Sequence, residues 1–361
     1  MDLEYKYDWF LHTDSSQKPS RSYPSISKKI RETMAVIIPH LTKTVHSTVY
    51  PAIDPTNPKL SASGKTVIIS GGTGGIGYAI SQGFCIAGAA RVVILARRQE
   101  ALDAAAAKLE AENLAAGRAT EVWTFLLDIR STSATNAVFE ALRERLNQTT
   151  RAGAIDADIL VTNAASLLQG KTALEFGPEG YSEVFETNVN GNLNLVRAFL
   201  GPEIPIIPYT TFDGIVKDTS TVPAPPTRQK VILDVSSSAT YLSLLGQAPY
   251  AASKLAFTQV MRTLQGELDG LPGRPVRVHS FNPGTIFTPG AAKMLDEEKA
   301  KAAFRWDDES LPRGFAVWLA SPEAAFLKGR FVMSNWDVDE LVALKDKYAK
   351  DPNFGTITLR M

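Results

Sequence analysis

Short apolar runs alternate with segments of helical apolar spacing along the chain from about residue 64 onward. The apolar runs predict strands at 66–70, 91–96, 121–127, 157–162, 230–235, 275–281 and 330–334. The segments between them predict helices near 76–88, 99–116, 133–147, 180–200, 249–269 and 311–320. Strands that alternate with helices form right-handed βαβ units. The pattern therefore predicts an α/β protein with a doubly wound parallel sheet and helices on both faces.

Two segments do not follow this alternation of strands and helices. The first 60 residues contain a predicted helix over 24–46 and then a proline-rich tether. We expect an arm that lies on the domain or on a partner subunit, and disorder is an equally open alternative. Residues 201–229 hold six prolines without clear periodicity, which indicates a surface insertion. The predicted organisation is an N-terminal arm (1–63), a single α/β domain (64–335) and a C-terminal tail (336–361).

Composition excludes several classes of protein. Lysine plus arginine and aspartate plus glutamate are 38 each, so no bulk positive field favours nucleic acid. The single cysteine, Cys85, allows neither an internal disulfide framework nor a multi-cysteine zinc site, and the four histidines show no ligand spacing. No uncharged apolar run is long enough to span a membrane, and the acidic, aromatic N-terminus resembles no signal or transit peptide. We expect a cytoplasmic protein without a metal site.

Glycines cluster directly behind the first predicted strand, in VIISGGTGGIGYAI (67–80). Gly72-x-Gly74-x-x-Gly77 fits a general dinucleotide fingerprint, and Ser70-Gly71-x-x-x-Gly75-x-Gly77 fits a narrower spacing. The β-branched run, the glycines and the helical pattern predict a strand, a tight turn and a helix whose N-terminus faces phosphates. No Lys-Ser/Thr follows the last glycine, which argues against a nucleoside-triphosphate loop. A glycine-rich turn without a ligand is the alternative.

A second motif points to proton transfer. Tyr250 and Lys254 are four residues apart on a predicted helix and therefore share one face. An ammonium near a phenol favours the phenolate, which suits a general acid or base. Ser237 lies thirteen residues earlier, at the carboxyl end of a predicted strand, where doubly wound sheets bind ligands. The neighbours Ser236 and Ser238 would face elsewhere if the register is correct.

These residues resemble the short-chain dehydrogenase/reductase family over roughly residues 64–335, and the arm and tail look similar to fungal members of it. The matched motifs follow the family's order: Ser70-Gly71-x-x-x-Gly75-x-Gly77, Asp128-Ile129, Thr162-Asn163-Ala164-Ala165, Asn188-Val189-Asn190-Gly191, Ser237, Tyr250-x-x-x-Lys254, and Asn282-Pro283-Gly284 with Thr288. Ser70 replaces the usual threonine, and Thr162 and Ala165 depart from the family's Asn-Asn-Ala-Gly. The resemblance implies a Rossmann-like fold and an oxidoreductase, a ketoreductase of the kind found in secondary metabolism.

The resemblance also assigns roles to individual residues. It implies that Tyr250 donates a proton during reduction, that Lys254 holds the ribose hydroxyls, and that Ser237 polarises the carbonyl. It further implies that Asn188 kinks its helix and holds a water in a proton relay. The cofactor-binding residues that it implies are Gly71, Thr73, Gly75, Ile76, Gly77, Arg97, Arg98, Asp128, Ile129, Asn163, Tyr250, Lys254, Pro283, Gly284, Ile286 and Thr288.

The choice of cofactor depends on the end of the second strand. Ala96 and Arg97 lie 19 and 20 residues past Gly77, where an enzyme that prefers NAD carries a carboxylate. An arginine there would pair with a 2′-phosphate, and Arg98 could share this role. The sequence therefore favours NADP(H), with NAD(H) as the alternative, and the usually reduced state of cellular NADP favours ketone reduction.

The substrate pocket is expected to involve Tyr241, Leu242, Phe287 and a lid over about 285–311, with Trp306 closing over an apolar or aromatic ketone. Two alternatives stay open: an NAD(P)-dependent alcohol dehydrogenase working oxidatively, and a non-catalytic NADPH sensor or scaffold. The resemblance implies a homo-oligomer formed through helices 180–200 and 249–269. The expected partner is a small-molecule substrate, with neither nucleic acid nor a membrane.

Overall fold

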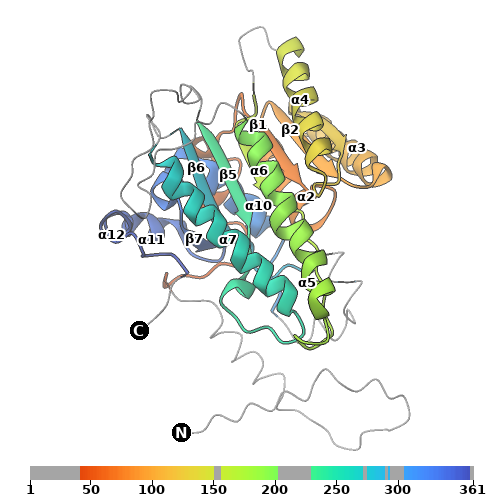
Figure 1. Cartoon of the computed structure of the whole chain (residues 1–361). Coiled ribbons are helices and arrows are strands. Elements are labelled where there is room, and N and C mark those ends of the chain that lie inside the picture. Colours follow the sequence, from red (N-terminus) through yellow and green to blue (C-terminus); the bar gives the residue numbers. More distant parts are fainter. Residues whose placement is uncertain are drawn as a thin grey trace, which may run out of the picture.

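The computed structural model describes residues 41–149, 156–201, 229–270, 275–288, 292 and 305–357. Seven strands form one sheet in the order β3-β2-β1-β4-β5-β6-β7, and every neighbouring pair is parallel (Figure 1). The strands are β1 (Thr66–Ser70), β2 (Arg91–Ala96), β3 (Glu121–Leu126), β4 (Ile159–Thr162), β5 (Lys230–Val235), β6 (Val276–Asn282) and β7 (Phe331–Met333). All seven predicted strands are present, and no predicted boundary differs by more than two residues.

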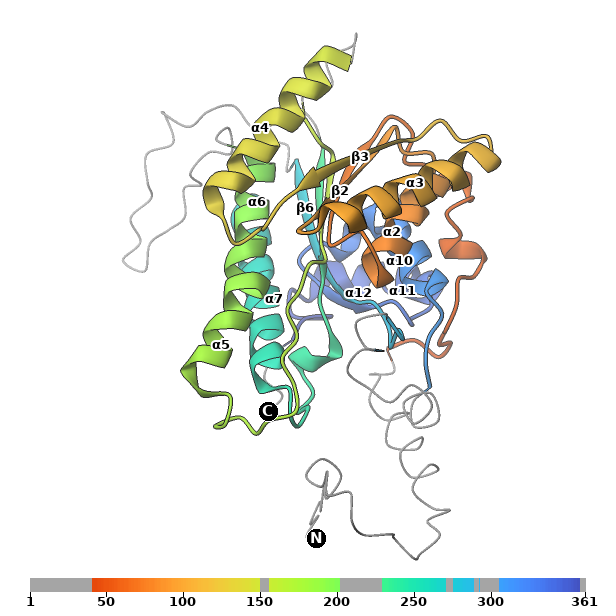
Figure 2. The same ribbon diagram turned by 90° about the vertical axis from the view of Figure 1, so that its right-hand side faces the viewer.

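Helices cover both faces of the sheet, as Figure 2 shows from the side. One face carries α2 (Gly75–Ile86), α3 (Gln99–Ala115) and α10 (Ser310–Ala320). The other face carries α4 (Thr132–Thr149), α6 (Asn192–Leu200) and α7 (Ala248–Leu268), with α5 (Gly177–Phe185) continuing the line of α6. The predicted doubly wound, Rossmann-like fold is confirmed. Among the described helices, none has the length and hydropathy of a membrane-spanning segment.

The predicted helix over 180–200 contains an interruption. α5 passes into a π-helical turn at Glu186–Gly191 before α6 begins. Such turns are rare and occur often at functional sites. The interruption falls on the motif that contains Asn188.

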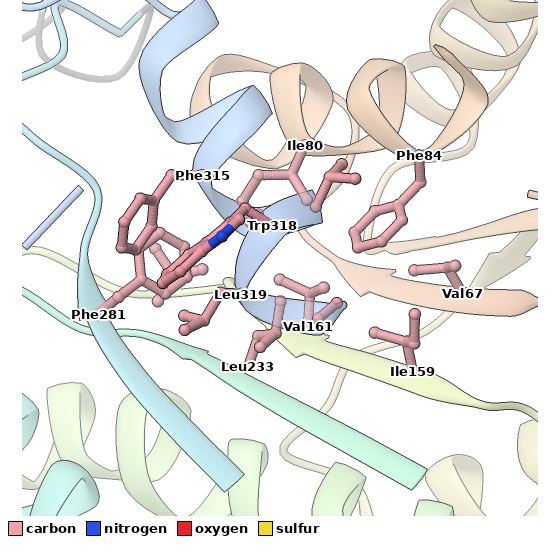
Figure 3. Packing of buried hydrophobic residues seen from close by; sticks show 14 of the residues in the cluster. Val67, Ile80, Phe84, Ile159, Val161, Leu233, Phe281, Phe315, Trp318 and Leu319 are labelled. Atoms are coloured by element: carbon pink, nitrogen blue, oxygen red, sulfur yellow. The ribbon is translucent and has the colours of Figure 1, made fainter. Parts of the chain in front are cut away.

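Two hydrophobic clusters lie on opposite sides of the sheet. The larger one lies between the sheet and α2 and α10. In Figure 3, Phe84 lies on the side of Val67 and Ile159, and Phe315 lies beside Phe281 and Trp318. Residues from β1, β2, β4 and β5 point alternately into this cluster and into the cluster beneath α4, α6 and α7. Because helices cover both faces of the sheet, each of these strands consists of a continuous run of apolar residues.

The described part of the N-terminal segment packs on the domain. Ile53, in a short 3-10 helix (η1, Pro51–Ile53), and Leu60, in a second (η2, Pro58–Leu60), are buried in the larger cluster. The predicted helix over 24–46 is wrong for residues 41–46, which are extended or bent, with Val45 paired to Trp336. Long-range pairing overrides the local helical pattern there. Residues 24–40 lie outside the described residues.

The C-terminal residues also belong to the packed structure. After β7 the chain forms α11 (Val338–Ala343) and α12 (Lys345–Lys350), and Leu341 and Tyr348 are buried against the larger cluster. Of the predicted insertion over 201–229 only its two end residues are described, and of the predicted lid over 285–311 only 285–288, 292 and 305–311 are described.

Candidate active site

The carboxyl ends of four neighbouring strands bring most of the predicted site residues together. The glycine loop follows β1, Asn163 follows β4, Ser237 follows β5, and Asn282-Pro283-Gly284 ends β6 and continues beyond it. The chain reverses its direction of progress across the sheet between β1 and β4, and doubly wound sheets bind ligands outside the carboxyl ends at this point. These residues therefore share one edge of the sheet.

The glycine loop has the backbone geometry of an anion-binding turn. Gly71 and Gly75 have φ angles of +67° and +51°, in the left-handed region that favours glycine. α2 begins after Gly74, whose position provides no side-chain cap for the free N–H groups of the first helical turn. Thr73 and Ile76 are partly exposed on this loop. Uncapped N–H groups at an open helix N-terminus fit a dinucleotide pyrophosphate.

A close approach of two segments explains the last glycine of the motif. A Cβ atom at Gly77 would lie 2.4 Å from the Gly71 carbonyl oxygen and 2.5 Å from Asn163 Nδ2. Asn163 Nδ2 itself donates to the carbonyl oxygens of Ser70 and Gly71, at 2.9 and 3.3 Å. Ser70 Oγ accepts hydrogen bonds from the backbone N–H groups of Asn163 and Ala164, both at 3.0 Å. These hydrogen bonds fix the glycine loop to the segment after β4.

Basic side chains lie at the end of β2, next to the glycine loop. The Gly71 N–H donates to the Leu95 carbonyl at 2.8 Å, and Arg97 and Arg98 follow as exposed residues. Asp128, after β3, accepts hydrogen bonds from Arg130 Nε at 3.0 Å on both oxygens. The Arg130 hydrogen bonds, together with the nearby charge of Arg97, lower the pKa of the Asp128 carboxyl. Arg130 is a charged neighbour that the motif comparison did not identify.

Ile129 is placed differently from its neighbour. Its side chain is buried in the cluster beneath α6, and a Cβ at Gly191 would lie 2.7 Å from Ile129 Cγ1. The close contact joins the end of β3 to the π-helical turn. The Ile129 side chain therefore packs in the core.

The Asn188 side chain is buried within the π-helical turn, and protein groups use its hydrogen-bonding capacity. Its Oδ1 accepts from the Ser166 N–H at 2.7 Å, and its Nδ2 donates to the Ser166 carbonyl and to Ser253 Oγ, both at 2.9 Å. Ser253 Oγ in turn donates to the Tyr250 carbonyl at 2.8 Å. The amide thus ties the segment after β4 to α7, beside Tyr250 and Lys254.

The three serines after β5 differ in burial and in the hydrogen bonds that they make. Ser236 is buried, and its hydroxyl lies 2.6 Å from Thr258 Oγ1 on α7. Ser237 is partly exposed, and its Oγ accepts from the Ala239 N–H at 3.1 Å, so its own hydrogen can be donated elsewhere. The backbone N–H of Ser238 donates to Asn282 Oδ1 at 2.9 Å. The register therefore places Ser237, rather than Ser236, at the open edge.

Tyr250 and Lys254 occupy the first turns of α7. Pro249 is the second residue of this helix, in the first turn, where a backbone N–H has no partner within the helix. Lys254 is 4 % exposed, and its Nζ donates to the Val235 carbonyl at 2.7 Å. The same nitrogen lies 5.9 Å from the centre of the Tyr250 ring. Asp234 is fully buried nearby; burial raises the pKa of its carboxyl, and the Lys254 charge opposes this.

The segment after β6 forms a tight loop. Gly284 has a φ of +92°, and Thr285 donates its N–H to Asp307 Oδ2 at 2.8 Å. Pro283 and Ile286 are buried, whereas Thr288 is partly exposed. The Asn282 side chain accepts from the Ser238 N–H and so joins this loop to the segment after β5. The loop therefore lies beside Ser237 at the same edge of the sheet.

Some residues that shape the site gave little or no signal in the sequence. Ser253 lies inside the Tyr-x-x-x-Lys motif, so its position alone could have drawn attention to it. Ser166 contacts Asn188 through its backbone, which no residue pattern reveals. Asp307 lies 22 residues beyond Thr285 in sequence, and only the fold brings the two together. Among the described residues no cluster of histidine, cysteine, aspartate or glutamate side chains could hold a metal ion.

Comparison with known proteins places these features in a family context. The family model described as short chain dehydrogenase matches residues 65–203 and 216–299. A short chain dehydrogenase/reductase of Claviceps purpurea (strain 20.1) is 36% identical over 89% of this chain and 95% of its own length. The short chain dehydrogenase/reductase nsrO of Aspergillus novofumigatus (strain IBT 16806) is 33% identical over 89% of this chain and 97% of its own.

Solved structures share the fold. L-sorbose reductase from Gluconobacter frateurii, complexed with NADPH and L-sorbose, has a TM-score of 0.61 at 24% identity and covers 76% of this chain and 96% of its own. A 7α-hydroxysteroid dehydrogenase complexed with NADH and 7-oxo glycochenodeoxycholic acid has a TM-score of 0.60 at 21% identity, over 80% of this chain and 97% of its own. The same fold thus occurs with both nicotinamide cofactors.

Proposed function

Because this chain belongs to the short-chain dehydrogenase/reductase family of NAD(P)-dependent oxidoreductases, we propose that it reduces a ketone to a secondary alcohol with NADPH. The substrate in this proposal is a small apolar or aromatic metabolite. The observation that carries the proposal is the placement of Ser237, Tyr250 and Lys254 at the sheet edge that also holds the glycine loop. A protein that only bound the cofactor would have no need of a proton donor there.

The hydrogen bonds of Ser237, Lys254 and Asn188 support the roles that we propose for them. When bound, the reduced nicotinamide supplies the hydride. Tyr250 donates its hydroxyl proton to the substrate oxygen, and Ser237 donates a hydrogen bond to the same oxygen as negative charge develops. The Ala239 N–H occupies one lone pair of Ser237 Oγ and leaves the hydroxyl hydrogen free to point outward.

Lys254 is positioned by its environment. The Val235 carbonyl accepts one of the three N–H groups of the ammonium. Two N–H groups are left, which in this proposal can donate to the ribose hydroxyls or point toward Tyr250. Its buried charge stabilises the tyrosine oxygen after the proton has left. Asn188 acts here as a positioning residue, because its Oδ1 and its Nδ2 are both bonded to protein groups, those of Ser166 and Ser253.

Arg97 supports the preference for NADPH. Its side chain is exposed at the end of β2, next to the glycine loop. Enzymes that prefer NAD carry an acidic residue at this place in the fold, and this chain has an arginine instead. Asp128 already pairs with Arg130, so this carboxylate competes less for the nearby Arg97 guanidinium, which can pair with a 2′-phosphate. Replacing Arg97 with alanine should raise the Kd for NADPH about tenfold or more and leave the Kd for NADH nearly unchanged.

The aromatic residues near the site support an apolar substrate. Phe287 and Trp306 are partly exposed, and their rings meet edge to face with centroids 4.9 Å apart. Tyr241 instead packs edge to face on Phe331 with 6.1 Å between centroids. Phe287 and Trp306 are therefore the stronger candidates for contact with substrate.

The test measures NADPH oxidation across a panel of ketones, and NADP⁺ reduction with the matching alcohols, for the natural chain and for Tyr250→Phe. We expect turnover with apolar or aromatic ketones, and a loss of at least about a hundredfold in kcat for the variant with its Kd for NADPH retained. Equal turnover in the variant would remove Tyr250 from the mechanism. Binding of NADPH without turnover of any substrate would favour a sensor, and turnover of alcohols alone would favour an oxidative enzyme.

A further inference from the structure

The carboxyl end of β5 is hydrogen-bonded to the face of α7 that carries Tyr250 and Lys254. Lys254 Nζ donates to the Val235 carbonyl at 2.7 Å. One turn further along the helix, Thr258 Oγ1 donates to Asp234 Oδ2 at 3.2 Å. Because Tyr250, Lys254 and Thr258 follow one another at intervals of four residues, they form one stripe along α7. Two successive residues of β5 thus bond to two successive residues of this stripe.

The serine that follows β5 extends this contact. Ile232 belongs to the cluster beneath α4, α6 and α7, and alternation along the strand directs Asp234 and Ser236 to the same face. The Ser236 hydroxyl lies 2.6 Å from Thr258 Oγ1. Since the single hydroxyl hydrogen of Thr258 is donated to the carboxylate, the Ser236 hydroxyl donates to Thr258. A directed chain of hydrogen bonds therefore runs from Ser236 through Thr258 to Asp234.

This chain of hydrogen bonds is buried between the helix and the sheet. Asp234 is 1 % exposed, and Ser236 and Thr258 are also buried. Ser280 lies beside Asp234 in the strand register, but it belongs to the sheet, so the Thr258 hydroxyl is the group that ties the carboxylate to the helix. Loss of a hydrogen bond to a buried carboxylate is costly. The contact therefore favours the one placement of α7 at which Thr258 meets Asp234 Oδ2.

We propose that Thr258 and Asp234 are positioning residues, which set the position of α7 along β5 and thereby the approach of Tyr250 to Ser237. Ser237 follows this contact directly in the chain, and Tyr250 lies two turns before Thr258 on the helix, about 12 Å along its axis. A displacement of about 1 Å at a catalytic group can lower the rate about a hundredfold. This inference rests on the proposed function, which assigns Tyr250 and Ser237 to the same substrate oxygen.

The test compares Thr258→Val, Thr258→Ser and Ser236→Ala in the full chain. Valine has nearly the shape of threonine but no hydroxyl, so it removes the tie between the helix and the carboxylate. Serine keeps the hydroxyl and lacks only the methyl group. Ser236→Ala is the matched control, because it removes a buried hydrogen bond to the same Thr258 hydroxyl and leaves Asp234 its donor from the helix.

Kinetics separate positioning from general stability. We expect kcat to fall at least about tenfold in Thr258→Val and to stay within about threefold of the natural chain in Thr258→Ser. Ser236→Ala should lower Tm and keep kcat. The Kd for NADPH should change less than about threefold in all three variants, because Lys254 keeps its bond to the Val235 carbonyl and the glycine loop is untouched. A role in stability alone would lower Tm in Thr258→Val without a loss of kcat.

Backbone hydrogen exchange without cofactor gives a second reading, which needs no substrate. Exchange over residues 250–258 should be faster in Thr258→Val than in Ser236→Ala, and Thr258→Ser should restore the rate of the natural chain. If Thr258→Val does not fold, Thr258→Ala takes its place, since it differs from Thr258→Ser only by the hydroxyl.

The outcomes are distinguishable. Equal kcat and equal exchange rates in Thr258→Val and Ser236→Ala, or in Thr258→Ala and Thr258→Ser, would overturn the inference and leave the proposed function intact. Absence of turnover with every ketone and alcohol would overturn the proposed function. Selectively faster exchange in Thr258→Val would then still support the placement of α7 by Thr258 and Asp234, and its absence would overturn that as well.

Discussion

Adding one methyl group at Gly77 perturbs the glycine loop in a way that the structure makes specific. The new Cβ would meet the Gly71 carbonyl oxygen at 2.4 Å and Asn163 Nδ2 at 2.5 Å. Neither atom can move alone, because the first belongs to the backbone of the tight turn and the second is bonded to Ser70 and Gly71. Gly74→Ala is the matched control, since a Cβ there has no described heavy atom within 4 Å and its φ of −173° suits any residue.

The magnitude follows from the displacement that is needed. The Gly71 carbonyl must move by about 1 Å, from 2.4 Å to an ordinary contact of about 3.4 Å. Overpacking of this kind costs about 1–3 kcal/mol, offset by about 0.5–1 kcal/mol of improved helix propensity. A shift of about 1 Å in a positioning element can also lower kcat/KM about a hundredfold. Gly74→Ala should cost at most about 1 kcal/mol, because alanine is a poorer N-cap than glycine.

The assay combines urea unfolding with titration of NADPH for both variants. We expect Gly77→Ala to lose about 1–2 kcal/mol of stability and at least tenfold in NADPH affinity, and Gly74→Ala to keep its affinity. If the two variants bind NADPH equally well, the close packing of the loop against Asn163 does not control the cofactor site.

Three further predictions concern buried and exposed polar groups. Asn188→Ala leaves both backbone groups of Ser166 unsatisfied and should lower the free energy of unfolding by about 2–4 kcal/mol in urea; an unchanged midpoint would contradict its positioning role. Ser236→Ala should reduce stability by about 1 kcal/mol and keep activity, whereas Ser237→Ala should lower kcat about a hundredfold, and the opposite pattern of activities would reverse the strand register. Burial lowers the pKa of His279 to about 3 from 6.5, so the unfolded chain binds the proton first and stability falls as pH drops below 6.5. The loss should be about 2 kcal/mol between pH 6.5 and 5 in urea titrations, and His279→Gln should lack it; an identical pH dependence in both would refute the burial of a neutral imidazole.

The sequence determined the elements and their order. Each buried parallel strand needs an uninterrupted apolar run on both faces, so the runs around Val67 and Leu233 marked their strands directly. Glycine spacing marked the turn after β1, because few other residues adopt the backbone angles of Gly71 and Gly75. The Tyr-x-x-x-Lys spacing predicted a shared helix face, and α7 contains both residues on its first turns. Local sequence is sufficient for such features because they depend on contacts within a few residues.

Only the tertiary structure decided how distant segments meet. Nothing in the local pattern shows that Asp307 bonds to Thr285 or that Asn188 bridges Ser166 and Ser253. The same is true of the N-terminal segment, in which Val45 pairs with the chain after β7. Residues 41–46 illustrate the reason, since a helical pattern gave way to pairing with Trp336. These partners are separated by 22 residues for Asp307 and Thr285 and by 289 for Asn335 and His46. Such hydrogen bonds form only once the fold has placed both partners, so they leave no periodic trace in the sequence.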